Sequence, residues 1–146
     1  MEPAKNERAP AYPLPVFNYR VQVGLEVLSF SEVSGLDLEY DKVIYKHGLS
    51  YAMGPNIIRT EPNPVTLSLR RGIAPKRSEL WRWFSEPTKK DLTIDLCDPT
   101  GAAIVRWKID KALPLKMTAP AFAAASNDVA IETLELIAPR LTLEYL

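Results

Sequence analysis

The stretch Asp91–Asp110, "DLTIDLCDPTGAAIVRWKID", holds two segments of alternating apolar and polar residues, separated by a turn signal. Alternation gathers one set of side chains on a single face, because successive side chains of a strand point to opposite sides. The turn "DPTG" at 98–101 favours a chain reversal, since proline presets φ and glycine permits a positive φ. The stretch therefore predicts an antiparallel hairpin with one buried face. That face comprises Leu92, Ile94, Leu96, Val105, Trp107 and Ile109.

The same two-residue period recurs on both sides of this hairpin, at 17–23 and 65–70 and, less regularly, at 129–146. Residues 25–35 follow a turn near Gly24 and are a plausible partner strand for the first of these segments. Repeated short alternating segments indicate a mainly β domain with antiparallel pairing, either a barrel or a sandwich. The residues expected to face inward are Phe17, Tyr19, Val21, Val23, Val65, Leu67 and Leu69.

One segment has helical spacing. In "RSELWRWFSEP", Ser78 is a plausible N-cap, Glu79 is favourable in the first turn and Pro87 would end the helix. Three apolar residues follow the i, i+3, i+4 spacing of a core-facing stripe. They are Leu80, Trp83 and Phe84. The sequence thus predicts one short α-helix at the side or end of the β domain.

The size and composition fit one folded domain. The chain has 146 residues, and we expect a proline-rich, flexible leader at 1–15 followed by a single domain at 16–146. Its 18 basic and 18 acidic residues balance, which argues against binding to nucleic acid or acidic membranes through a strong field. No apolar run approaches the roughly 20 residues that span a bilayer, so no membrane anchor is expected. The leader lacks the apolar centre of a secretory signal.

Catalytic and metal-binding patterns find little support. His47 is the only histidine and Cys97 the only cysteine, which leaves too few ligands for a typical metal site and no internal disulfide. Cys97 is expected to be a buried or half-buried thiol, and His47 a surface or interface side chain. The acids of 37–41 alternate along a strand and are expected to be solvated. We therefore predict no catalytic residues, no metal and no cofactor, and a protein that is not an enzyme.

Two basic segments, 70–77 and 88–90, flank the predicted helix. Neither is interleaved with aromatic residues as in a surface that binds single-stranded nucleic acid. We expect them to be solvated loop ends. A charged subunit surface or a channel wall is the alternative.

The segment Phe30–Lys46, "FSEVSGLDLEYDKVIYK", is apolar on both faces, because its alternation slips after Asp41. A β-bulge could reconcile the slip, or a partner subunit could cover the second face. The stretch 54–64, between prolines, is expected to be a loop. The small residues of 119–125 suit close backbone approach, and such surplus apolar surface is typical of an interface. These patterns favour a self-assembling β module.

In order along the chain, "FSEVSGL" (30–36), "LWRWF" (80–84) and "SNDVAIETLEL" (126–136) resemble the tail-tube proteins of contractile injection systems and contractile-tailed phages. The resemblance covers nearly all of residues 12–143, and the chain departs from the family pattern at 48–64. It implies a β-barrel-like domain with a side helix, similar to the secreted ring protein of type VI secretion.

The resemblance also implies a mechanical function. Six copies would form a ring, and rings would stack into the hollow inner tube of a phage-like tail, which a contractile sheath propels. The implied partners are the sheath, baseplate or spike and terminator proteins, with protein or DNA cargo in the lumen. Assembly would occur in the cytoplasm, with possible release of the particle from the cell.

The segment 36–58 is predicted to be an arm that contacts a neighbouring copy. The predicted interface residues are Leu36, Leu38, Tyr40, Val43, Ile44, Tyr45, Leu49, Tyr51, Ile57 and Ile58. The competing hypothesis is a monomeric or dimeric β-barrel binding module for carbohydrate or nucleic acid. A hydrolase is a third and weaker alternative, because a single loop histidine supplies no second catalytic group.

Overall fold

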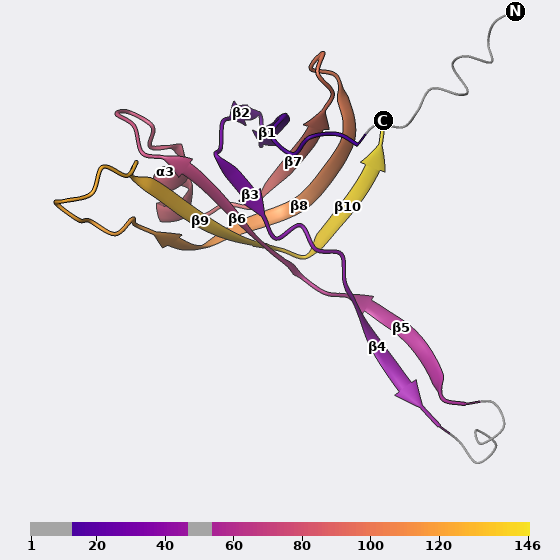
Figure 1. Cartoon of the computed structure of the whole chain (residues 1–146). Helices are drawn as coiled ribbons and strands as arrows, with labels where there is room; N and C mark the ends of the chain where they lie inside the picture. The colour runs from indigo at the N-terminus through magenta and orange to yellow at the C-terminus, as the bar shows by residue number, and fades with distance from the viewer. Residues whose placement is uncertain (1–12, 47–53) are drawn as a thin grey trace, which may run out of the picture.

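The computed structural model describes residues 13–46 and 54–146, which form two antiparallel sheets, a short helix and a projecting hairpin (Figure 1). The first sheet has the strand order β2-β1-β7-β8-β10. Its members are β1 (Tyr19–Val23), β2 (Glu26–Leu28), β7 (Lys90–Cys97), β8 (Ala103–Thr118) and β10 (Arg140–Tyr145). The predicted hairpin at 91–110 is confirmed, since β7 and β8 pair with Ile94 opposite Trp107. Asp98 fixes the turn by accepting the backbone N–H of Thr100 at 2.9 Å.

The second sheet has the order β3-β6-β9-β8 and shares β8 with the first. Its other strands are β3 (Glu32–Ser34), β6 (Val65–Gly72) and β9 (Ile131–Ala138). The strand β8 serves both sheets because it bends at Lys111, which has a φ of 57° and donates its N–H to Asp91 Oδ1 at 2.9 Å. Pro139 separates β9, which pairs with the second half of β8, from β10, which pairs with the first half.

The core lies between the two sheets, and the helix α3 (Glu79–Ser85) closes one side of it. Leu80 and Trp83 are buried and Phe84 packs against the core, as the helical spacing predicted. Trp83 also donates its indole N–H to the carbonyl of Thr88 at 2.6 Å. Ser78 occupies the N-cap position but makes no side-chain capping hydrogen bond. The predicted class, a mainly β antiparallel fold with one short side helix, is confirmed for the described residues.

The basic segment 70–77 differs from the expectation of solvated loop ends. Arg71 is 1% exposed. Its guanidinium lies 2.8 Å from Glu132 on β9 and 2.9 Å from Glu79 at the start of α3. It also donates to the carbonyl of Arg77 at 3.0 Å. Three partners satisfy the buried charge, so Arg71 ties β6, β9 and the helix together.

The hairpin of β4 (Tyr40–Tyr45) and β5 (Asn56–Pro62) extends away from the two sheets (Figure 1). We call these two strands the arm. The expectation of a loop at 54–64 was therefore wrong for 56–62. Alternation did not reveal β5, because the arm buries neither face against the body and no period-two pattern is required of it.

Candidate self-assembly surface

The arm carries apolar side chains on both of its faces. Val43 lies opposite Ile58, and the next pair, Ile44 and Ile57, points to the other face. Every described residue of β4 and β5 is exposed, with large apolar side chains between 41% and 65% accessible. Among the described strands, β4 and β5 pair only with each other. The arm therefore presents apolar side chains that the described part of the chain leaves uncovered on both faces.

The phase slip in the sequence coincides with an irregularity in the pairing of β4 with β5. Tyr40 pairs with Pro62, whereas Lys42 pairs with Arg59, so the register shifts by one residue between these pairs. Two residues of β5, Thr60 and Glu61, thus lie opposite the single Asp41 on β4. An irregularity is thus present beside Asp41, but its extra residue lies on β5 and leaves the alternation along β4 unchanged. The apolar residues on both faces of β4 are exposed, and what covers the second face stays a prediction.

Contacts at the base fix where the arm leaves the body. The backbone N–H of Asn63 donates to the carbonyl of Glu39 at 2.8 Å, which holds the two chain segments together. The guanidinium of Arg59 lies 3.8 Å from the centre of the Tyr40 ring, a cation–π contact on an exposed surface. The first contact joins the residues that flank the two strands, and the second joins β5 to β4.

The structure separates the predicted interface residues into three groups. Tyr40, Val43, Ile44, Tyr45, Ile57 and Ile58 lie on the arm and are exposed. Leu38 is exposed just before β4, whereas Leu36 is half-buried and packs against the core. Leu49 and Tyr51, like His47, lie outside the described residues.

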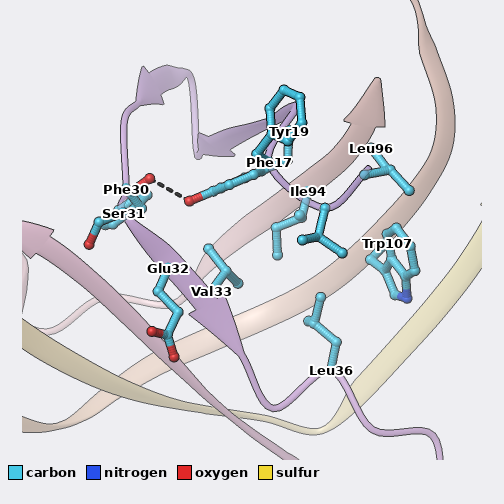
Figure 2. A pocket seen from close by; sticks show the side chains of 11 residues that line it. Phe17, Tyr19, Phe30, Ser31, Glu32, Val33, Leu36, Ile94, Leu96 and Trp107 are labelled. Atoms are coloured by element: carbon cyan, nitrogen blue, oxygen red, sulfur yellow. Dashed lines mark hydrogen bonds between the residues drawn. The ribbon is translucent and has the colours of Figure 1, made fainter. Parts of the chain in front are cut away.

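A second feature was missed by the sequence reasoning. An apolar pocket of about 550 Å³ opens between β1, β3, β7 and β8 (Figure 2). We call it the Trp107 pocket. Its lining residues are Val16, Phe17, Tyr19, Phe30, Ser31, Glu32, Val33, Leu36, Ile94, Leu96 and Trp107. These residues come from distant parts of the chain. The inward face predicted for 17–23 includes Tyr19, which packs against the core, whereas the expectation for Phe17 was wrong, because it is 80% exposed.

One polar group is fixed inside the Trp107 pocket. The hydroxyl of Tyr19 donates to the carbonyl of Phe30, as Figure 2 shows. Burial, and then the nearby carboxylate of Glu32, raise the pKa of the Tyr19 phenol. The phenol therefore stays protonated and keeps its donor role at neutral pH. Phe17 and Val16 at the rim are 80% and 86% exposed, so apolar surface continues outward from the pocket.

The outer face of the first sheet is charged and internally neutralised. Asp95 on β7 is held by Arg106 through two contacts of 2.8 and 3.1 Å and lies 3.6 Å from Arg20 on β1. On the neighbouring strands Lys108 lies 3.7 Å from Glu144. Cross-strand pairs of opposite charge stabilise a sheet modestly and leave little net field. Asp95 itself is 5% exposed, so its partners Arg20 and Arg106 form the accessible part of this network.

The described residues show no cluster of metal-ligating side chains. Within 13–46 and 54–146, no three His, Cys, Asp or Glu side chains gather as a metal site would need. Cys97 is buried, as expected, and its thiol lies 3.7 Å from the carbonyl of Asp95. No helix in the described ranges is both long and apolar enough to cross a membrane. The arm and the Trp107 pocket are the candidate functional features.

The described structure is a two-sheet β domain with a side helix and an exposed apolar hairpin. The family model of the T4-like virus tail tube protein gp19 matches residues 15–142. The chain belongs to this family. No curated protein sequence shows significant similarity to it.

Solved structures give the same result. The chain is 27% identical to a chain of the anti-feeding prophage cap (AFP tube terminating cap), with a TM-score of 0.89 and 100% of both chains covered. It is 30% identical to a chain of the PVC extracellular contractile injection system sheath–tube complex in the extended state, with a TM-score of 0.86 and 100% and 99% covered.

The chain is 33% identical to a chain of the PVC extracellular contractile injection system sheath/tube terminator in the extended state. The TM-score is 0.86, and the match covers 93% of this chain and 99% of the other. The fold alone is shared with Hcp1 from Flavobacterium johnsoniae, which is 16% identical with a TM-score of 0.56 over 89% and 97% of the two chains. The predicted family and the predicted type VI-like fold are thus confirmed.

Proposed function

We propose that this tail-tube protein assembles into hexameric rings that stack as the inner tube of a contractile injection particle or phage-like tail. The family match and the sheath–tube and terminator structures support this role. In such a particle the partners are further copies of the chain, a sheath, a baseplate or spike, and a terminator. Protein or DNA cargo would occupy the lumen.

One observation carries the proposal: the arm is apolar on both faces, and each of its described residues is exposed. Leaving large apolar side chains in water is unfavourable, so a neighbouring copy would stabilise the assembled form. A standard interface of about 800 Å² per partner gives moderate affinity. Several such contacts on each subunit would make a tube far more stable than a pair, through multivalency.

The function is mechanical on this proposal, and no residue turns over a substrate. Assembly in the cytoplasm, with the particle retained or released, is the corresponding location. The monomeric or dimeric binding module is not favoured, because both the family and the solved neighbours are tube or tube-terminating components.

Negative-stain electron microscopy of the purified full-length chain, over a series of concentrations, tests the proposal. Rings of six subunits, or stacked rings, are expected, with sedimentation velocity giving the ring mass. A single monomeric or dimeric species at the highest concentration would contradict the proposal. Rings that never stack would restrict the protein to a single layer of the tube.

A further inference from the structure

We infer that the Ile44–Ile57 face of the arm of one copy docks into the Trp107 pocket of a neighbouring copy. This inference rests on the proposed self-assembly and specifies which two surfaces meet. The proposed occupant of the pocket is therefore a second copy of this chain.

The Trp107 pocket offers apolar surface that the described part of its own chain leaves open. The Trp107 pocket is a surface hollow of about 550 Å³ that opens to solvent, with Ile94, Leu96 and Trp107 in its wall. Its rim is apolar too, because Phe17 is 80% exposed. An apolar insertion from outside would complete the packing between the sheets.

Charge selects the arm as the occupant. On one face of the arm, the Ile44–Ile57 pair is followed by the pair of Lys42 and Arg59, so an apolar centre lies next to two cations. The Trp107 pocket presents Glu32, whose side chain is 53% exposed and, within the described residues, has one basic contact, Arg70 at 3.2 Å. Apolar side chains would fill the pocket while a cation meets Glu32 at the rim.

The loop between β8 and β9, another exposed apolar segment, fits less well. The loop between β8 and β9 carries Phe122, which is 86% exposed, and Val129, which is 73% exposed. The ionisable residue of this loop is Asp128, a second carboxylate that would meet Glu32 unfavourably. The opposite face of the arm, with Val43 and Ile58, lacks the basic pair.

The contact is heterologous, because the arm and the pocket are different surfaces. Within one copy the arm points away from the sheets that form the pocket (Figure 1). Each copy would therefore give one arm and receive another. Such contacts close into a ring or continue as a filament, depending on the rotation between copies.

Cysteine cross-linking tests the inference directly. Ile57→Cys and Phe17→Cys both replace exposed residues, so a chain with both substitutions is expected to fold. On oxidation it should give a ladder of covalent oligomers on a non-reducing gel, which collapses to monomer with reductant. Cys97 is buried and remains in every variant. The matched control combines Ile57→Cys with Phe122→Cys and is expected to remain monomeric on the gel.

The outcomes separate this inference from the proposed function. Tubes seen by microscopy without an Ile57–Phe17 ladder, or with an Ile57–Phe122 ladder, would overturn the docking and leave the tube proposal standing. Failure of the unmodified chain to assemble would overturn both.

A charge exchange gives an independent readout. Glu32→Lys and Arg59→Glu should each reduce the fraction of protein that pellets as assembled material, and the two changes combined should restore it. If Glu32 matters only through its contact with Arg70, the combination will be no better than Glu32→Lys alone, and the docking is overturned.

Discussion

At the residue scale, the buried Arg71 is the charge on which the packing of β6, β9 and α3 depends. Its contacts with Glu132, Glu79 and the carbonyl of Arg77 compensate the cost of removing a guanidinium from water. Arg70, the next residue, is half-exposed, and its partner among the charged groups of the described residues is Glu32. Neighbours in sequence therefore play different roles.

Replacing Arg71 by alanine should lower the free energy of unfolding by about 3 kcal/mol or more, because a partly buried carboxylate loses its partner. The matched Arg70→Ala should cost less than about 1 kcal/mol, as for other exposed pairs. Urea titration followed by circular dichroism measures both. Equal costs for the two variants would mean that the burial of Arg71 is unimportant for stability.

The Glu79 carboxyl links this network to pH. Its own backbone N–H, and then the Arg71 guanidinium, lower the pKa of Glu79 below the ordinary value of 4.5. A lowered pKa in the folded state stabilises the fold above pH 4.5, and this contribution is lost as the pH falls through the lowered value. The urea midpoint should therefore fall more steeply below pH 4.5 in the unmodified chain than in Glu79→Gln. Parallel profiles would contradict this assignment.

Gly35 is required where the chain passes from β3 toward the arm. Its φ is +91°, and a Cβ there would lie 2.9 Å from Leu67 Cα and nearer still to the carbonyl oxygen of Thr66. Gly101 has a similar φ of +90° but open space around it. Gly35→Ala should thus cost at least about 2 kcal/mol more than Gly101→Ala, from overpacking in addition to backbone strain. Similar thermal midpoints for the two variants would count against this.

At the element scale, the arm is stabilised by its own cross-strand pairs and not by the core. Val43–Ile58 and Ile44–Ile57 are direct partners, and the Arg59–Tyr40 contact supports its base. Single hairpins are marginal in water, so further burial against a neighbour would stabilise this one. Stability of the domain and assembly should therefore be separable by mutation.

Ile44→Asp should block tube formation while changing the free energy of unfolding by no more than about 0.5 kcal/mol, since the side chain is exposed. Ile44→Leu is the matched control and should still assemble. Size-exclusion chromatography with circular dichroism distinguishes the two. A folded Ile44→Asp variant that still forms tubes would exclude the arm from the interface.

At the scale of the whole molecule, the domain and the arm meet at a narrow junction. The hydrogen bond between Asn63 and Glu39 brings the two ends of the arm together. The strands β4 and β5 pair with each other and form no described pairing with the eight strands of the body. The body should therefore fold without the arm.

Replacing residues 40–62 by two glycines should leave a monomer that unfolds cooperatively and no longer assembles. Light scattering coupled to chromatography gives the mass, and thermal unfolding reports the fold. Loss of cooperative unfolding would show that the arm stabilises the body. Tubes formed by the shortened chain would remove the arm from assembly.

The sequence by itself determined the β7–β8 hairpin, the position of α3 and most of the core, because a buried face imposes a period on neighbouring residues. It also indicated the arm residues Ile44 and Tyr45 through their surplus apolar character. Their role as an interface stays a prediction.

Only the tertiary structure decided the burial of Arg71, the strand character of 56–62 and the Trp107 pocket. Arg71 is buried because Glu132 and Glu79 approach it from other elements. The pocket joins Phe17, Leu36 and Trp107, which are far apart in the chain. The period of apolar residues along a strand predicts which of its faces is buried. The pairing of strands that are distant in sequence determines which residues that face contacts and where a pocket is left open.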